Sequence, residues 1–373
     1  MPPSDTLNKL YVEITTACNL DCTMCERRTW AEPFGHMPLA TFEDLMEQIG
    51  RLPAPPIIHF GGYGEPMVHP HFLKLVALAK ATGAKVEMTT NGHLLNRDMA
   101  EALIDLDLDR IMVSIDGVRP EIYHNIRVRG SYSQVIENFR HLRRLKLRKG
   151  GRHSNPQVGI AFVAMKSNVA DIQKLPWLAV YIGAWDIQVS NVVPHYPEME
   201  AEILYERSLT SAAYRASRWV PNMRLPKFDM DEHTQKPVGE LFDSIVSLSW
   251  FNGSLSQSSN YCRFVHEGYA VIRRDGEVSP CLPLLHDHPV YLHGRRKDVT
   301  RHALGNINQK PLDEIWNSPE YKAFRANVRE FPFSPCTTCG GCERFSANHV
   351  DCSHNTFPTC GGCVWAQGIV QCP

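Results

Sequence analysis

The positions of the cysteines constrain this chain more than any other feature. Three lie near the start, Cys18, Cys22 and Cys25, and nine lie near the end: Cys262, Cys281, Cys336, Cys339, Cys342, Cys352, Cys360, Cys363 and Cys372. Cysteines that served only as small apolar residues would be scattered through the core, and a disulfide framework suits a short secreted chain. Clustering at both ends of the chain therefore predicts that these thiols bind metal.

The composition is that of an ordinary globular protein. The 373 residues are 43% hydrophobic and 21% charged, with a formal net charge of −1, and this length predicts about two domains. The near-neutral charge gives no reason to expect nucleic acid or an anionic membrane surface as a partner. The sequence shows neither a signal-peptide pattern nor an apolar run long enough to cross a bilayer. We therefore expect a cytoplasmic protein with reduced thiols.

Short apolar and β-branched runs alternate with helical patterns through the first half. The expected strands are Leu10–Thr16, Ile57–Gly62, Lys85–Asn91, Arg110–Asp116, Val158–Ala164 and Ile187–Val193. The expected helices between them are Thr41–Leu52, His71–Thr82, Asp98–Leu106, Pro120–Ile126 and Tyr132–Lys149. This alternation predicts an α/β fold, a partial (β/α)6 TIM-like barrel with its active site at the carboxyl ends of the strands.

The rest of the chain divides into two parts. We expect the barrel in residues 1–200, a connector with one or two helices in residues 201–260, and a cysteine-rich domain in residues 261–373. In this last part helical periodicity is weak apart from Pro311–Asn327, so bound metal must supply much of its stability. The basic stretch Arg140–Arg152 favours a solvated helix face over a docking patch for an acidic electron carrier.

The N-terminal cysteines follow the first expected strand with the spacing C-x3-C-x2-C. Thiolates favour zinc or iron–sulfur clusters. Zinc sites usually close with four protein ligands, but the next cysteine is Cys262 and the next histidine is His36. Three thiolates would instead leave one iron of a four-iron cluster open to a small molecule.

This spacing resembles that of the radical S-adenosylmethionine (SAM) superfamily, whose cluster binds SAM and reductively cleaves it to a 5′-deoxyadenosyl radical. Further motifs lie at the ends of the next three expected strands, and one more follows the last of these strands. Gly61-Gly62-Tyr63-Gly64-Glu65-Pro66 resembles the motif that receives the SAM amino group, and Thr89-Thr90-Asn91-Gly92 resembles the family's third strand end. Ser114 and Asp116 resemble residues that bind the ribose and methionine, and Arg127 resembles the arginine that pairs with the SAM carboxylate. The resemblance thus implies these cofactor-binding residues: Gly61, Gly62, Gly64, Glu65, Asn91, Ser114, Asp116 and Arg127.

The C-terminal cysteines begin with C-x13-G-x4-C around a hairpin-like segment, Gly268–Ser279. This pattern resembles the opening of a SPASM domain, which holds auxiliary [4Fe–4S] clusters. The resemblance implies two such clusters, one on Cys262, Cys281 and Cys363 with Cys342 or Cys352, the other on Cys336, Cys339, Cys360 and Cys372. A zinc ribbon on Cys336, Cys339, Cys360 and Cys363 is the alternative. The nearby histidines are expected in surface or turn positions rather than as ligands: His286, His288, His293, His349 and His354.

Three segments resemble a SPASM subgroup regarded as maturases of tungsten-containing aldehyde oxidoreductases: Leu10–Trp30, Phe60–Pro66 and Thr359–Pro373. The resemblance implies a radical SAM maturase acting on a protein or cofactor precursor, with ferredoxin or flavodoxin as electron donor. Two alternatives stay open. One is a peptide-modifying SPASM enzyme that forms thioether cross-links or matures sulfatases, and the other is a non-catalytic iron–sulfur scaffold or electron carrier.

Overall fold

The computed structural model describes residues 5–149, 151, 154–206, 261–334, 336–337 and 342–371, with the backbone of three short connector strands. Those strands, β7 (Asn222–Leu225), β8 (Ser247–Trp250) and β9 (Gly253–Ser254), form a small sheet of their own. The one or two helices expected in the connector fall largely outside the described residues.

Six parallel strands form the centre of the molecule, as expected for a partial barrel. They are β1 (Lys9–Val12), β2 (Ile57–Phe60), β3 (Val86–Thr90), β4 (Arg110–Ser114), β5 (Gln157–Ala164) and β6 (Asp186–Asn191). Each strand pairs with the next one in sequence, so the sheet order follows the chain. The carboxyl ends of all six strands therefore meet at one edge, where the expected site motifs lie.

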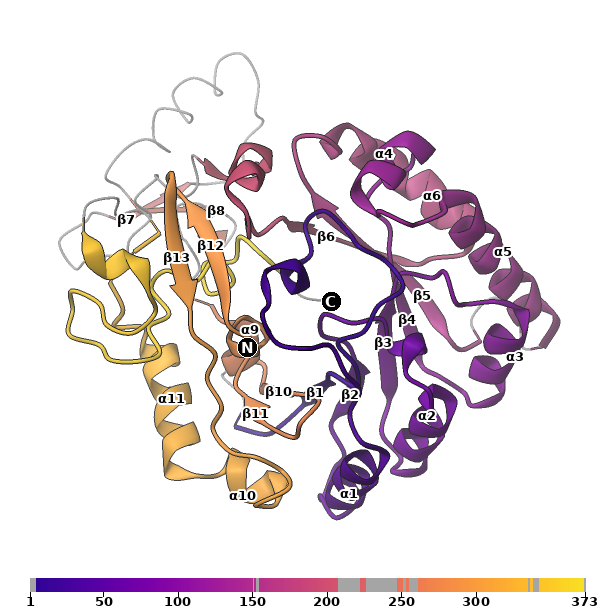
Figure 1. Cartoon of the computed structure of the whole chain (residues 1–373), viewed down its shortest axis with the longest axis horizontal. Coiled ribbons are helices and arrows are strands. Elements are labelled where there is room, and N and C mark those ends of the chain that lie inside the picture. The colour runs from indigo at the N-terminus through magenta and orange to yellow at the C-terminus, as the bar shows by residue number, and fades with distance from the viewer. Residues whose placement is uncertain are drawn as a thin grey trace.

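Helices cover the outer side of this curved sheet (Figure 1). They are α1 (Leu39–Gly50), α2 (Phe72–Ala81), α3 (Arg97–Asp105), α4 (Pro120–Ile126), α5 (Tyr132–Lys149) and α6 (Leu175–Ile182). The core that they enclose includes fully buried Leu45, Leu75 and Phe139, and burying each such side chain contributes roughly 1.5–3 kcal/mol. On the basic face of α5, Arg140 and Arg144 both pair with Glu137 at 2.9 Å, which favours the solvated face.

A hairpin from the cysteine-rich region extends the barrel sheet, which the sequence did not lead us to expect. The strands β10 (Tyr269–Ile272) and β11 (Val278–Ser279) are antiparallel, and β10 pairs in parallel with β1. The full sheet therefore has eight strands, in the order β11-β10-β1-β2-β3-β4-β5-β6. This pairing places the C-terminal domain directly beside the loop that carries the N-terminal cysteines (Figure 1).

The rest of the C-terminal domain consists of small elements around that hairpin. They are α9 (Arg263–His266), the antiparallel pair β12 (His288–Leu292) and β13 (Arg295–Val299), α10 (Leu312–Trp316) and α11 (Pro319–Glu330). The segment with helical periodicity, Pro311–Asn327, contains α10 and most of α11, with a break between the two helices. The break has a local cause, because the Ser318 side chain accepts a hydrogen bond from Tyr321 N and Pro319 occupies the first turn of α11. In the part of the chain that the structure describes, no helix has the length and apolar character to cross a bilayer.

Candidate functional site

The three N-terminal thiols line one cavity at the carboxyl edge of the barrel. Cys18, Cys22 and Cys25 lie between β1 and a short 3-10 helix, Glu26–Thr29, and all three contribute to the wall of a cavity of about 310 Å³. Burial raises the pKa of the Cys22 thiol to about 11 and also raises that of Cys18. A bound metal would displace these protons, because only the thiolate is a metal ligand.

A buried arginine holds the loop around these thiols in shape. Arg27 Nη1 donates to the carbonyl of Thr16 at 2.9 Å, and Nη2 donates to that of Leu20 at 3.1 Å. The loop also docks on the end of α4, where Thr23 N donates to the carbonyl of Ile126 at 2.9 Å. Backbone that would otherwise carry unsatisfied buried groups is thereby fixed with its sulfur atoms facing the cavity.

The glycine-rich segment after β2 approaches the cysteine loop closely. A Cβ atom on Gly64 would lie 2.1 Å from the carbonyl oxygen of Thr15, so only glycine fits, and Gly62 has a φ of +137°. Glu65 then turns into the barrel. Its carboxylate accepts hydrogen bonds from Asn91 N at 2.7 Å and from Thr90 Oγ1 at 2.8 Å, while burial raises its pKa to about 7.

Most of the residues expected to bind the cofactor share this cavity with the thiols. Its lining includes Gly61, Gly62, Gly64, Glu65, Asn91, Ser114 and Arg127. Asp116 has a different place: it is fully buried and accepts a hydrogen bond from Arg127 Nε at 2.6 Å and another from Val163 N at 2.8 Å. Despite burial, the Asp116 carboxylate raises the pKa of Arg127. Asp116 thus orients the arginine rather than lining the cavity.

Several lining residues were not anticipated. The C-terminal tail closes one side, because Val370 and Gln371 line the cavity and Asn191 Nδ2 donates to the carbonyl of Ile369 at 2.8 Å. Glu26 and His195 also line it. Both carried a signal in the sequence, since Glu26 directly follows Cys25 and His195 lies just past the sixth strand. No pattern in the sequence indicated that the C-terminal tail would line the cavity.

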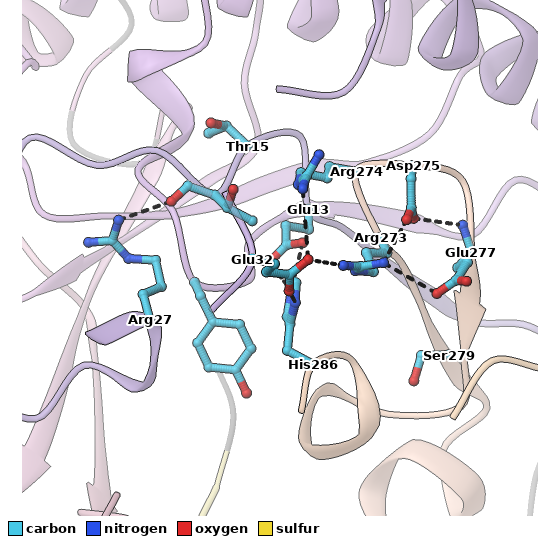
Figure 2. A network of polar contacts seen from close by, with 12 residues as sticks. Glu13, Thr15, Arg27, Glu32, Arg273, Arg274, Asp275, Glu277, Ser279 and His286 are labelled. Atoms are coloured by element: carbon cyan, nitrogen blue, oxygen red, sulfur yellow. Dashed lines mark hydrogen bonds and ion pairs between the residues drawn. The ribbon is translucent and has the colours of Figure 1, made fainter. Parts of the chain in front are cut away.

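A buried polar network joins the cysteine loop to the C-terminal hairpin (Figure 2). His286 Nε2 lies 3.0 Å from both carboxylate oxygens of Glu13, and its Nδ1 contacts Glu32. Glu32 also pairs with Arg273 at the end of β10. The imidazole of His286 stacks on Trp30 with ring centroids 3.9 Å apart. The network fixes the relative positions of the two cysteine-bearing regions.

The structure groups the C-terminal cysteines differently from expectation. The buried Cys281 thiol interacts electrostatically with those of Cys262, Cys363 and Cys360, which add to the effect of burial in raising its pKa. Cys360 thus joins the set that we expected around Cys262. The local reason is the C-x2-C spacing, which forms a turn with Cys363 N donating to the carbonyl of Cys360 at 3.0 Å.

Three other cysteines form a second group. The pKa of Cys336 is raised by burial, and its thiol interacts with those of Cys352 and Cys342, which were the candidates for the first set. Cys339 and Cys372 lie outside the described residues. Lys297 is buried and interacts with Cys336 of this group and with Cys363 and Cys360 of the first. The buried Lys297 therefore interacts electrostatically with thiols of both groups.

The expectation for two of the histidines was wrong. His286 and His288 are buried, at 0% and 4% exposure, rather than lying on the surface or in turns. His286 belongs to the network of Figure 2, and His288 is the first residue of β12. His293 and His354 do adopt left-handed backbone conformations typical of turns. The difference arises because the cysteine loop packs over β12, which the local sequence does not reveal.

Comparison with known proteins shows matches along most of the sequence. The family model described as the radical SAM superfamily matches residues 12–158, and the SPASM iron–sulfur cluster-binding domain model matches residues 262–343. A tungsten-containing aldehyde ferredoxin oxidoreductase cofactor-modifying protein from Pyrococcus furiosus is 30% identical over 372 residues, covering 98% of this chain and 96% of that protein.

Solved structures have the same fold at lower identity. Streptococcus suis SuiB bound to its precursor peptide SuiA has a TM-score of 0.58 at 15% identity, covering 91% of this chain and 70% of SuiB. The protein anSMEcpe with bound AdoMet has a TM-score of 0.55 at 17% identity, covering 97% of this chain and 96% of that one.

The chain therefore belongs to the radical SAM superfamily, as a SPASM-containing member of the family of the Pyrococcus cofactor-modifying protein. Membership implies a [4Fe–4S] cluster and SAM as cofactors. The residues fit them: three thiols share a cavity with the carboxyl group of Glu65 and the guanidinium of Arg127, groups that can complement the ammonium and carboxylate of SAM. Membership of the superfamily also indicates that the protein is an enzyme.

Proposed function

We propose that this protein is a radical SAM maturase that modifies a cofactor precursor or protein during maturation of a tungsten-containing aldehyde oxidoreductase. The observation that carries the proposal is the shared cavity, in which Cys18, Cys22 and Cys25 face Glu65 and Arg127. An electron carrier would need the thiols but not the carboxylate and guanidinium. The name of the Pyrococcus relative supports the substrate class.

Each residue has a defined part in this proposal. Cys18, Cys22 and Cys25 hold the cluster, which when bound supplies the electron that cleaves SAM to methionine and a 5′-deoxyadenosyl radical. Gly61, Gly62 and Gly64 let the backbone approach the SAM amino group, and the carboxylate of Glu65 attracts it. Arg127 pairs with the SAM carboxylate while Asp116 keeps the guanidinium oriented. Asn91 and Ser114 complete the polar wall around the methionine and ribose.

The C-terminal groups complete the proposal. Cys262, Cys281, Cys360 and Cys363 would hold one auxiliary cluster, and Cys336, Cys342 and Cys352 would supply ligands to the second. The described thiols and the undescribed Cys339 and Cys372 together offer enough ligands for two cubes. These clusters would pass electrons between the site and a ferredoxin or flavodoxin in the cytoplasm.

The test is anaerobic turnover with candidate substrates. Reduced enzyme and SAM are incubated with the tungsten–pterin cofactor fraction of an aldehyde oxidoreductase, with the apo-oxidoreductase, or with an unrelated cysteine-containing peptide. We expect 5′-deoxyadenosine formation to rise with one of the first two, accompanied by a mass change in that substrate. Stimulation and modification of the peptide alone would favour the peptide-modifying alternative. A protein that forms no 5′-deoxyadenosine under any condition would be the scaffold.

A further inference from the structure

A second set of side chains, of types that can ligate metal, lies at the same cavity, where Glu26 and His195 line the wall and His288 lies beside them. Glu26, His195 and His288 come from three distant parts of the chain: the 3-10 helix after Cys25, the loop after β6, and the start of β12. Their side chains are 1%, 6% and 1% exposed. Each offers one ligand atom, and these atoms all lie within 4.8 Å of one another.

The hydrogen bonds of this trio leave acceptor atoms without a donor. His195 Nδ1 lies 3.0 Å from the carbonyl of Pro289, and His288 Nδ1 lies 3.0 Å from that of His286. Carbonyl oxygens only accept, so both rings carry their proton on Nδ1 and present a lone pair at Nε2. Among the described residues, His288 Nε2 and Glu26 Oε2 are buried with no hydrogen-bond partner.

Distances argue against an ordinary histidine–carboxylate hydrogen bond. Glu26 Oε2 lies 3.7 Å from His195 Nε2, and Glu26 Oε1 lies 3.5 Å from His288 Nδ1, so neither contact is a short hydrogen bond. In a tetrahedral site with bonds of about 2.1 Å, neighbouring ligand atoms lie roughly 3.4 Å apart. By contrast, His286 in the same region approaches Glu13 to 3.0 Å. The separation between Glu26 Oε2 and His195 Nε2 is therefore close to that between neighbouring ligands of one ion, and the ligand atoms of all three side chains lie within 4.8 Å of one another.

The hydrogen bonds of both imidazoles to backbone carbonyls, through Nδ1, are typical of histidines that bind metal. A ligating imidazole donates its other N–H to a backbone carbonyl or carboxylate, which fixes the tautomer and ring orientation. The carboxylate is supported too, because Trp30 Nε1 donates to Glu26 Oε1 at 3.3 Å. Leaving two buried acceptors without a donor destabilises the fold, and one bound cation would satisfy both.

We propose that Glu26, His195 and His288 bind a divalent transition-metal ion, of the Fe²⁺ or Zn²⁺ class, separate from the iron–sulfur clusters. Two imidazoles and one carboxylate are a donor set that these ions favour, and it leaves coordination positions open. Glu26 and His195 line the cavity, so the ion is placed to take an oxygen or other anionic group of the substrate that enters it. The site would thus anchor the substrate near the three-cysteine loop.

The experiment measures metal binding without SAM or turnover, so its outcome is independent of the proposed function. Protein with fully reconstituted clusters is stripped with a mild chelator and titrated anaerobically with Zn²⁺. We expect one tightly bound zinc per chain, whose X-ray absorption spectrum shows nitrogen and oxygen neighbours at about 2.0–2.1 Å. Sulfur neighbours at about 2.3 Å would instead report zinc in the cysteine groups.

Variants assign the ligands. His195→Ala and His288→Ala should each weaken zinc binding at least about 100-fold with unchanged cluster iron. His302→Ala is the control, because that half-buried imidazole contacts the rings of Phe324 and Phe357 and should leave zinc affinity unchanged. Glu26→Gln tests the carboxylate with little change of shape. The proposal is overturned if wild-type protein takes up no zinc with nitrogen and oxygen ligation, whatever the folding of the variants, or if both histidine variants bind it normally.

Discussion

The two cysteine-bearing regions differ in what surrounds their thiols. The N-terminal three share a cavity with Glu65 and Arg127, and they stop one short of the number that closes a four-iron cube. The C-terminal set around the buried Cys281 comprises four interacting thiols, packed against side chains such as Val265 and Phe331. In the function proposed above, the open position of the N-terminal centre and the polar groups beside it suit a reactive centre, whereas the four-thiol set suits electron transfer.

Removing the N-terminal thiols gives the largest expected effect. Replacing Cys18, Cys22 and Cys25 with alanine should abolish 5′-deoxyadenosine formation while about eight of twelve irons per chain remain. Product analysis and iron analysis on the same anaerobic sample check both parts. Undiminished cleavage would show that SAM reacts elsewhere. About four remaining irons would mean one auxiliary cube, and zinc without iron would mean a zinc ribbon.

Removing two C-terminal thiols tests their grouping. Cys360→Ala with Cys363→Ala should cost about four irons, because both thiols belong to the set around Cys281. The EPR signal of the N-terminal cluster with SAM should persist. A loss close to eight irons would show instead that the two cysteines serve different cubes, as the sequence first suggested.

Arg127 tests the polar groups of the open centre. Its loss should remove a charge-assisted bond to the SAM carboxylate, so SAM affinity should fall about 10–100-fold. Because Asp116 would be left as a buried unpaired charge, the comparison is made between Asp116→Asn alone and Asp116→Asn with Arg127→Ala. Equilibrium binding of SAM supplies the measurement. Equal affinity in the two proteins would assign the carboxylate contact to another base, such as Arg129.

Lys297 gives the smallest expected effect. Burial lowers its pKa, while the thiols of both C-terminal groups favour its charge. Unit charges about 5 Å apart interact by about 3 kcal/mol at an effective dielectric constant of 20, so Lys297→Met should lower the auxiliary potentials by roughly 100 mV. Potentiometric titration followed by EPR would measure this. The exposed Lys310 provides a control, and an equal shift at the N-terminal cluster would contradict a local effect.

The candidate residues could be expected to lie together from the sequence because the rule that places them is topological. In a parallel sheet every strand ends at the same edge, so motifs after successive strands must meet. Gly61, Glu65, Asn91 and Ser114 follow this rule and line one cavity with the three N-terminal thiols. The rule predicts the edge of the sheet at which a residue lies but not the direction of its side chain. It therefore did not separate Arg127, which faces the cavity, from Asp116, which lies behind Arg127.

Local sequence patterns were enough to predict the strands β1 to β6, the three-thiol loop and a cysteine-rich C-terminal domain. The pairing of β10 with β1, the position of Cys360 beside Cys281, and the meeting of His195 and His288 with Glu26 became visible in the folded chain alone. The cause is the distance along the chain over which each interaction acts. Strand periodicity and cysteine spacing act over a few residues, whereas those contacts join segments that only packing of the complete chain brings together.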